Sequence, residues 1–319
     1  MSFIITGTGS ATPTNIVDNA YFEKLVDTSD DWITTRTGIK TRHILKDQTL
    51  LDIGIKAAQN ALDNANIKAQ ELDMIICSTI QGDYIVPSFA CLLQKNLGAK
   101  CPAFDVNAAC SGFLYSLDIA DSYFKSGKYS KVLIVSCEQL SKFVDYTDRT
   151  TCVLFGDAAG AVVLEKGDSL KYINLTAKGD NENLKITSAL QKSPFNATPS
   201  PQGYLYMNGQ EIFKYAVSTA IKAFKDASKQ TGLKADDINF YLLHQANGRI
   251  IEMVQNQLKQ PKEKFPFNYN EYGNTSAASI PLLLDEQNKK GILKKGKILF
   301  LSAFGGGLTS GSAIIEWSK

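Results

Sequence analysis

Histidine is the scarcest chemically reactive residue in this chain, which has only His43 and His244 among its 319 residues. Six cysteines are present, but no two of them form a CxxC pair. Structural and catalytic zinc sites draw mainly on cysteine and histidine, often in closely spaced pairs. The shortage of these ligands predicts that the protein binds no metal.

The chain also lacks a long apolar run and a strong net charge. No stretch approaches the roughly 18 consecutive apolar residues that a membrane-spanning helix needs, and the N-terminal segment does not resemble a signal peptide. The 34 basic and 32 acidic residues leave a formal net charge of +2, which gives no general attraction to nucleic acid. We expect a cytoplasmic protein with reduced cysteines that binds neither a membrane nor nucleic acid.

Two parts of the sequence resemble each other. Residues 55–61 and 221–227 match at an isoleucine, a lysine and two alanines, with an offset of 166 residues. The same offset aligns residues 131–136 with residues 297–302, both of which read as apolar strands. Two separated matches at one offset indicate an internal duplication. We therefore predict an N-terminal half, residues 1–170, and a C-terminal half, residues 171–319.

Each half reads as helix, strand, turn, helix, strand and hairpin. Residues 55–65 carry apolar side chains at helical spacing. The strands predicted at residues 74–77 and 240–243 are short and almost entirely apolar. Such strands are buried on both faces, so helices should cover both sides of each sheet. The sequence therefore predicts an α/β fold in which two similar halves pack face to face.

Three polar side chains stand at turns that the duplication relates. Cys110 lies in a turn of small residues before a predicted helix, where a helix N-terminus can lower the pKa of a thiol below its usual value of about 8.5. His244 follows a core strand at its C-terminal end, where open α/β sheets usually place ligands. Adding 166 to the number of Cys110 gives Ser276, two residues beyond Asn274. We expect the three side chains to meet in one place.

Together these side chains could perform nucleophilic catalysis. His244 could act as a general base or donate an N–H to a developing oxyanion, whereas Asn274 offers only hydrogen bonds. Two neutral donors facing a nucleophilic thiol suit the stabilisation of an enolate or a tetrahedral intermediate. Each residue taken alone also has an ordinary interpretation: a buried core cysteine, a strand-end histidine and a turn asparagine.

Two further patterns suggest ligand contacts. Gly305, Gly306 and Gly307 follow a predicted strand and would let backbone N–H groups approach a ligand, although they lack the Lys-Ser/Thr ending of a nucleotide P-loop. Trp32 and Arg36 are four residues apart and share one face of a predicted helix. An indole and a guanidinium suit a nucleotide with phosphates, such as that of coenzyme A, but they could equally be a surface packing pair.

The combination of motifs resembles the β-ketoacyl-acyl carrier protein synthase III family of thiolase-like condensing enzymes, over essentially the whole chain. The motifs that carry the resemblance are residues 30–38 (DDWITTRTG), 108–113 (AACSGF), 155–160 (FGDAAG), 244–247 (HQAN), 273–281 (GNTSAASIP) and 304–307 (FGGG). Several such motifs in this order are specific, whereas any one of them would be weak.

The resemblance implies a five-layered αβαβα fold, a homodimer and a decarboxylative condensation. A short acyl group would pass from acyl-CoA to Cys110 and then react with malonyl-acyl carrier protein. His244 and Asn274 would stabilise the thioester enolate. Acyl-CoA would be a substrate, so no cofactor is implied.

The resemblance also implies further site residues. Its contacts with coenzyme A and the substrate tunnel correspond to Trp32, Arg36, Arg149, Gly209, Phe213, Asn247 and Phe304. Backbone N–H groups of Cys110, Gly305 and Gly306 would hold an oxyanion, and Lys214 and Arg249 would meet the acidic carrier protein. Val86 stands where relatives often carry a larger aromatic residue that closes the acyl pocket from across the dimer, which predicts room for a longer or branched primer.

Two alternatives to fatty-acid initiation deserve comparison. A specialised relative in secondary metabolism would use the same three residues with a different acyl group, and the sequence does not separate it from the first interpretation. A papain-like thiol hydrolase also orders Cys, His and Asn along its chain. This sequence lacks the cysteine signature of those enzymes, and its internal duplication argues against them.

Overall fold

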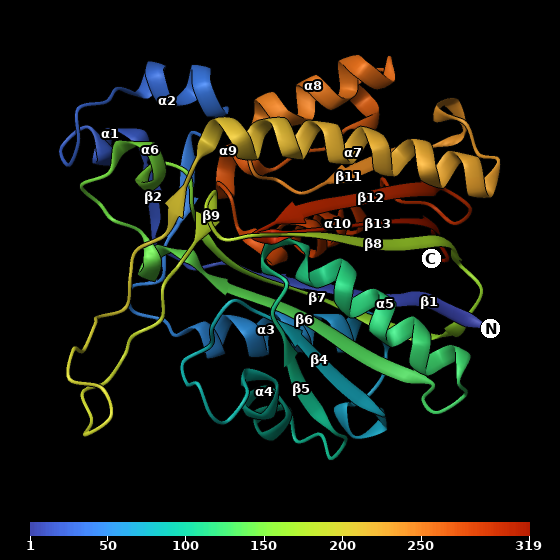
Figure 1. The fold of residues 1–319 in the computed structure, drawn as a ribbon. Coiled ribbons are helices and arrows are strands. Elements are labelled where there is room, and N and C mark those ends of the chain that lie inside the picture. The colour runs from blue at the N-terminus through green and yellow to red at the C-terminus, as the bar shows by residue number, and fades with distance from the viewer.

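The two halves of the chain build separate β-sheets that lie one above the other (Figure 1). The computed structural model describes residues 1–319. The first sheet has the strand order β1-β7-β6-β4-β5, and the second has the order β11-β12-β13-β8. The first sheet contains β1 (Ser2–Ala11), β4 (Met74–Ser78), β5 (Ala103–Val106), β6 (Lys131–Gln139) and β7 (Asp157–Gly167). The second contains β8 (Leu170–Asp180), β11 (Phe240–Leu243), β12 (Ile298–Gly305) and β13 (Gly307–Glu316).

Helices cover both faces of each sheet. The outer layers are α3 (Leu50–Ala65) with α4 (Phe89–Leu97), and α7 (Gly209–Thr231) with α8 (Gly248–Leu258). The central layer between the sheets consists of α5 (Gly112–Lys125) and α10 (Ser279–Lys289). The order of layers is therefore αβαβα, and the predicted fold class is confirmed. No helix combines the length and the apolar composition needed to cross a membrane.

Strand β6 shows why the sheets need cover on both sides. Its alternate side chains Leu133 and Val135 pack in the cluster formed with α3 and α4, whereas Val132 and Ile134 pack in the central cluster with α5. Successive residues of a strand point to opposite faces, so an all-apolar strand is stable only between two layers. The continuous apolar run in the sequence thus dictates the layered packing.

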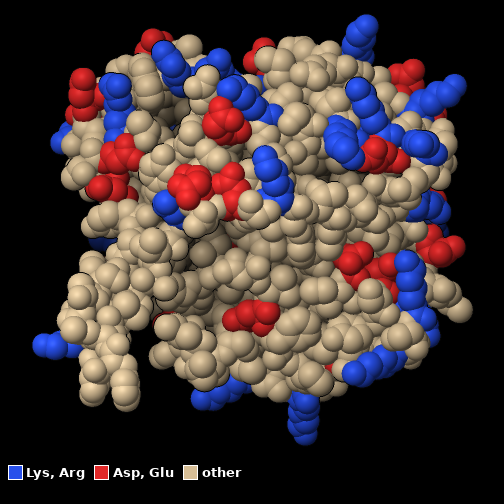
Figure 2. All heavy atoms as spheres, in the orientation of Figure 1, with Lys and Arg blue, Asp and Glu red and all other residues tan.

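Smaller elements cover one end of the two sheets. They are β2 (Ile16–Asp18), α1 (Asn19–Phe22), α2 (Asp30–Thr37), β3 (Thr41–His43), α6 (Arg149–Cys152), β9 (Leu184–Lys185), β10 (Tyr206–Met207) and α9 (Tyr269–Tyr272). A separate apolar cluster, including Phe22, Ile33 and Phe143, holds this cap together. Residues 186–204 project from the cap as a long loop at the lower left of Figures 1 and 2, and Lys192 is their only charged residue. The cap encloses the ends of the strands that carry the site.

The halves share a topology, but the alignment between them changes by one residue. Met74 of β4 pairs with Val132, and Phe240 of β11 pairs with Leu299, so the offset of 166 at the first strand becomes 167 at the second. The short turns η2 (Ala109–Ser111) and η6 (Ser276–Ala278) both begin with a residue of positive φ, Ala109 at 46° and Ser276 at 52°.

Cys110 therefore corresponds to Ala277, and the ungapped match to Ser276 was wrong by one position. The second half carries one extra residue between its first core strand and its turn. All strands of the first sheet lie within residues 2–167 and all strands of the second within residues 170–316. The division near residue 170 stays a prediction, because α10 packs on strands of both sheets and the halves share the central apolar cluster.

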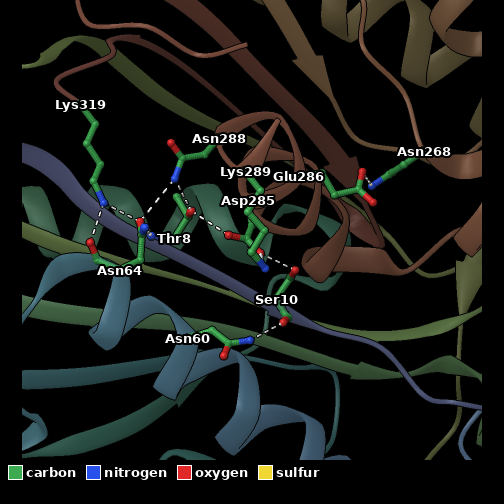
Figure 3. A network of polar contacts seen from close by, with 10 residues as sticks. All are labelled: Thr8, Ser10, Asn60, Asn64, Asn268, Asp285, Glu286, Asn288, Lys289 and Lys319. Carbon is green, nitrogen blue, oxygen red and sulfur yellow. Dashed lines mark hydrogen bonds and ion pairs between the residues drawn. The ribbon is translucent and has the colours of Figure 1, made fainter. Parts of the chain in front are cut away.

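A buried polar network joins the first sheet to the central helix of the second half (Figure 3). Asp285 on α10 is completely buried. Its carboxylate accepts hydrogen bonds from Thr8 Oγ1 at 2.8 Å and Ser10 Oγ at 2.5 Å, both on β1. Lys289 forms an ion pair with the same carboxylate at 2.7 Å. A buried carboxylate with three partners fixes the position of α10 against β1.

Asp285→Ala should destabilise the fold, because it leaves the Thr8 and Ser10 hydroxyls and the Lys289 ammonium without their shared partner. We expect the free energy of unfolding to fall by roughly 3 kcal/mol. Chemical denaturation followed by circular dichroism measures the change. Asp226→Ala is the matched control, since its ion pair with Lys222 is exposed and should contribute less than about 0.5 kcal/mol. Equal losses in the two variants would contradict a coupling role for Asp285.

Candidate active site

Cys110, His244 and Asn274 open onto one cavity beneath the cap. The cavity has a volume of about 390 Å³, and most of the side chains that line it are apolar. The three residues come from the turn before α5, the end of β11 and the turn before α10. The expectation that the folded halves bring these side chains into a common space is therefore met by the geometry.

Cys110 stands in the turn η2, directly before the N-terminus of α5. Burial raises the pKa of its thiol to about 12. The Ser276 hydroxyl, with Oγ 3.4 Å from Sγ, opposes this effect. The thiol is thus protonated near neutral pH, and ionising it requires a nearby group to take the proton.

His244 carries a neutral imidazole, which is held in place by hydrogen bonds of its backbone N–H and its ring Nδ1. Its backbone N–H donates to the Ser302 carbonyl at 2.8 Å, and burial lowers the pKa of the ring to about 3. Ser279 Oγ lies 2.7 Å from Nδ1 and accepts from the Gln245 backbone N–H at 3.4 Å. A hydroxyl that accepts from the backbone can donate its proton to Nδ1. We therefore assign the proton of the ring to Nε2, the nitrogen left to face the cavity.

The side-chain amide of Asn274 is also held so that a hydrogen-bond donor faces the cavity. Its Oδ1 accepts from the Ser276 backbone N–H at 2.9 Å. Its backbone N–H donates to the Leu154 carbonyl at 2.8 Å, and its own carbonyl accepts from Gly156 at 3.1 Å. With Oδ1 engaged in the turn, the side-chain NH₂ is the part that remains for the cavity. His244 and Asn274 consequently offer two neutral N–H donors to one space.

The end of β12 approaches the cysteine turn closely. A Cβ atom built at Gly305 would lie 2.6 Å from the backbone nitrogen of Cys110, a distance that no side chain tolerates. Gly305 and Gly306 both line the cavity. Glycine is therefore required at position 305 for the strand to reach the turn, and the backbone of both segments faces the same space.

An indole between two guanidinium groups stands at another part of the cavity wall. Trp32 and Arg36 of α2 line the cavity, with the Arg36 guanidinium 5.4 Å from the indole centroid. Arg149 of α6 does not line the cavity, but its guanidinium lies 5.0 Å from the same indole. Its Nη1 also donates to the Asp27 carbonyl at 2.8 Å. A partly buried aromatic ring with two cations beside it can hold a planar base and its phosphates.

Four other predicted residues line the cavity: Gly209, Phe213, Asn247 and Phe304. Asn247 also caps α8, since its Oδ1 accepts from the Arg249 backbone N–H at 2.9 Å. The Phe304 ring meets the imidazole of His244 edge to face, with 5.2 Å between centroids. The cavity thus runs from the indole, past α7 and α8, to the three polar side chains.

Besides Arg149, three predicted residues lie outside this cavity. Val86 is 83% exposed on the loop between β4 and α4. Lys214 is exposed on α7, where it forms an ion pair with Glu211 at 2.8 Å, and Arg249 is exposed on α8. Val86 therefore cannot shape the cavity of its own chain, and any role in an acyl pocket requires a second copy. Lys214 directly follows Phe213, and Arg249 comes two residues after Asn247. Phe213 and Asn247 both line the cavity.

Sequence reasoning missed Glu138, a buried carboxylate beside the cysteine. It stands near the end of β6 and is only 2% exposed. Its oxygens accept from Ser276 Oγ at 3.0 Å and from the Ile80 backbone N–H at 3.1 Å. Burial raises the pKa of Glu138 to about 8. One signal was available, because a single carboxylate within an otherwise apolar strand is costly to bury without a purpose.

Comparison with known proteins agrees with the layered fold. Residues 104–180 match the family model described as 3-oxoacyl-[acyl-carrier-protein (ACP)] synthase III, and residues 228–317 match the model of its C-terminal part. A protein of Clostridium acetobutylicum named β-ketoacyl-[acyl-carrier-protein] synthase III is 44% identical over 320 residues, covering 99% of this chain and 98% of that protein. The two names describe the same chemical group, since a β-ketoacyl is a 3-oxoacyl.

Solved structures give the same result. The crystal structure of 3-oxoacyl-[acyl-carrier-protein] synthase III from Aquifex aeolicus superposes with a TM-score of 0.92 at 44% identity, covering 99% of this chain and 100% of that one. The priming β-ketosynthase of the R1128 polyketide pathway has a TM-score of 0.91 at 30% identity, covering 100% and 97%. Similarity at this level over the full length shows that the chain belongs to the 3-oxoacyl-[acyl-carrier-protein] synthase III family.

Proposed function

We propose that this protein is a β-ketoacyl-acyl carrier protein synthase III, an acyltransferase that initiates fatty-acid biosynthesis. It condenses a short acyl group from acyl-CoA with malonyl-acyl carrier protein, releases CO₂ and produces a 3-ketoacyl-carrier protein. The observation that carries this proposal is the meeting of Cys110, His244 and Asn274 in one largely apolar cavity, in a chain that belongs to this family.

The first half-reaction is acyl transfer to Cys110. The sulfur attacks the thioester carbonyl, the carbon–sulfur bond to coenzyme A breaks, and the thiol proton ends on the departing coenzyme A sulfur. Negative charge develops on the carbonyl oxygen in the transition state. In this proposal, backbone N–H groups of Cys110, Gly305 and Gly306 stabilise this charge, since all three residues line the cavity.

The second half-reaction is decarboxylative attack on the acyl-cysteine. Malonyl-carrier protein loses CO₂ and leaves an enolate, whose oxygen accepts hydrogen bonds from His244 Nε2 and the Asn274 side-chain NH₂. Both donors are neutral, and the low pKa of His244 keeps its ring uncharged throughout. The enolate carbon then attacks the acyl carbonyl and releases the Cys110 sulfur. Fixed donors in a dry site stabilise a developing charge strongly.

The remaining cavity residues bind the long substrate arm. Trp32 stacks against the adenine ring, while Arg36 and Arg149 neutralise the phosphates of coenzyme A. Gly209, Phe213, Asn247 and Phe304 border the pantetheine chain. Lys214 and Arg249 lie beside this wall on exposed faces of α7 and α8, where an acidic carrier protein would dock. Acyl-CoA and the carrier protein are substrates in this scheme, and no cofactor or metal takes part.

A second copy of the chain would complete the acyl end of the cavity. Tyr84, Ile85 and Val86 are 59%, 88% and 83% exposed, so an apolar loop lies open to solvent in the single chain. Phe195 is completely exposed in segment 186–204, which projects at the lower left of Figure 2. Large exposed apolar groups mark interaction surfaces. We propose a cytoplasmic homodimer in which Val86 of each copy closes the acyl pocket of the other.

The alternative of a specialised enzyme in secondary metabolism is not favoured. The priming polyketide synthase is 30% identical to this chain, whereas the synthase III of Aquifex aeolicus is 44% identical at a comparable TM-score. A thiol hydrolase is less compatible with the site, because burial lowers the pKa of His244 to about 3 and makes the ring a weak base for activating the cysteine.

Incubation with acetyl-CoA should add one acetyl group to Cys110, because this thiol opens onto the cavity. Intact-mass spectrometry with peptide mapping measures the adduct. Cys110→Ala should abolish the adduct, whereas Cys91→Ala, which removes an exposed thiol elsewhere, should leave it unchanged. An adduct on another cysteine, or none at all, would overturn the proposed nucleophile.

A panel of acyl-CoA primers should acylate Cys110 beyond the acetyl group, because valine at position 86 leaves more space than an aromatic residue would. Val86→Phe should shift the preference back to acetyl-CoA, with a loss of about tenfold or more for a four-carbon branched primer. The ratio of kcat/KM values between primers is the readout. A strict acetyl preference in the unmodified protein would contradict the role of Val86.

Arg249→Glu should raise KM for malonyl-carrier protein about tenfold, because it places a negative charge where an acidic partner docks. KM for acetyl-CoA should change much less, since Arg249 does not line the cavity. Lys128→Glu, in the exposed turn that follows α5, serves as the control for the change in net charge. Equal effects on both substrates would remove Arg249 from the docking surface.

A further inference from the structure

The hydroxyl of Ser276 lies between the Cys110 sulfur and the Glu138 carboxylate. Ser276 Oγ lies 3.4 Å from Cys110 Sγ and 3.0 Å from Glu138 Oε1. Ser276 and Glu138 are both buried, with 0% and 2% of their surface exposed. The roles proposed above for Cys110, His244 and Asn274 make no use of either residue, and a carboxylate placed here without function would be an expensive feature.

The duplication explains how Glu138 reaches this position. With the corrected offset of 167, Glu138 at the end of β6 corresponds to Gly305 at the end of β12, and Ala277 corresponds to Cys110. Each strand end contacts the turn of the other half. Gly305 leaves space beside the Cys110 backbone nitrogen, whereas the Glu138 carboxylate lies against the turn that contains Ala277 and accepts a hydrogen bond from Ser276 Oγ in that turn. One turn therefore lies against a titratable carboxyl group at the place where its counterpart lies against Gly305 and the cavity.

When the three groups together carry one negative charge, the single proton of Ser276 permits two arrangements. When Glu138 is ionised, Ser276 donates to the carboxylate and the Cys110 thiol donates to Ser276. When the sulfur is ionised, Ser276 donates to the thiolate and the protonated Glu138 donates to Ser276. Both arrangements satisfy every hydrogen bond and carry the same net charge of minus one.

We propose that Ser276 and Glu138 form a proton relay that ionises Cys110 for acyl transfer. Ser276 Oγ takes the thiol proton as its own proton passes to Glu138 Oε1, so the S–H bond breaks and a carboxyl O–H bond forms. The thiolate attacks the primer, and the proton returns through Ser276 to the departing coenzyme A sulfur. This inference rests on the proposed function and adds to it the group that accepts the proton.

The relay moves a charge within the buried site instead of creating one. Burial of a new anion in an apolar cavity is costly, and exchanging a carboxylate for a thiolate avoids most of that cost. His244 is unsuited to the task, because burial lowers its pKa to about 3 and its Nδ1 is bonded to Ser279. The start of α5 adds a favourable dipole at the sulfur.

The charged and titratable neighbours of Glu138 are few. Lys142, which follows β6, lowers the pKa of the Glu138 carboxyl group. The Glu138 carboxylate in turn raises the pKa of two thiols, Cys110 on η2 and Cys77 on β4. The Lys142 ammonium donates to the carbonyls of Gln81 and Gly82 at 2.8 and 3.1 Å, so it stands off from the carboxylate. Glu138 therefore titrates mainly under the influence of its burial.

The pH dependence follows from this arrangement. Burial raises the pKa of Glu138 to about 8 and that of Cys110 to about 12. Below pH 8 the carboxyl group is protonated and cannot accept the thiol proton, so the rate of acylation falls. Between the two values the relay keeps a constant net charge, and the rate should be independent of pH.

The test is the rate of Cys110 modification by iodoacetamide and by acetyl-CoA, followed by intact mass across a range of roughly pH 6 to 10. The unmodified protein should show a rate that rises and levels off near pH 8. Glu138→Gln keeps the hydrogen bonds but cannot accept a proton, so its rate should be about tenfold or more lower at pH 8 and should keep rising with pH. Affinity for acetyl-CoA should not change.

A second pair of variants tests the hydroxyl independently of Glu138. Ser276→Ala should reproduce the Glu138→Gln profile, and Ser276→Thr, which retains a hydroxyl, should restore the plateau. Asp285→Asn, which removes a different buried carboxylate, should lower stability without altering the profile. A plateau retained in both Glu138→Gln and Ser276→Ala would overturn the relay. Absence of any acyl adduct in the unmodified protein would instead overturn the proposed function.

Discussion

The contact between the two turns at the centre of the molecule is the constraint on which the site depends. Each turn precedes a central helix of its own half, and each is closed by a strand end from the opposite half. Gly305 permits the closest of these contacts, because any side chain there would collide with the Cys110 backbone. The cavity therefore exists only when both halves are packed, and the polar network around Asp285 helps to hold them in that arrangement.

Burial determines the chemical character of each group in the cavity. It keeps the His244 imidazole neutral, keeps the Cys110 thiol protonated and raises the pKa of the Glu138 carboxyl group. A charge that appears in such a site has few water molecules to stabilise it, so fixed N–H donors contribute more than they would in solution. For the same reason, exchanging the Glu138 carboxylate for a Cys110 thiolate costs less free energy than creating a new pair of opposite charges in the site.

The sequence identified the residues at the centre of the site better than those at its edges. Cys110, His244 and Asn274 were recognisable because small-residue turns and a strand-end histidine precede or follow apolar segments with clear periodicity. Glu138 was missed, since a strand sequence does not reveal what lies beside its last residues in the fold. The one-residue change in offset was also hidden, because identical lysines at positions 131 and 297 fit the ungapped match. The roles of Val86, Lys214 and Arg249 still depend on partners that a single chain does not contain.

By itself the sequence determined the layered α/β fold and the family, because apolar strands need cover on both faces and a set of ordered motifs is specific. Tertiary structure decided what the polar groups can do. Hydrogen-bond direction at Ser279 and Ser276, the depth of burial and the approach of Gly305 to Cys110 all arise from contacts between residues far apart in the chain. Protonation states depend on such neighbours, so they cannot be read from local sequence.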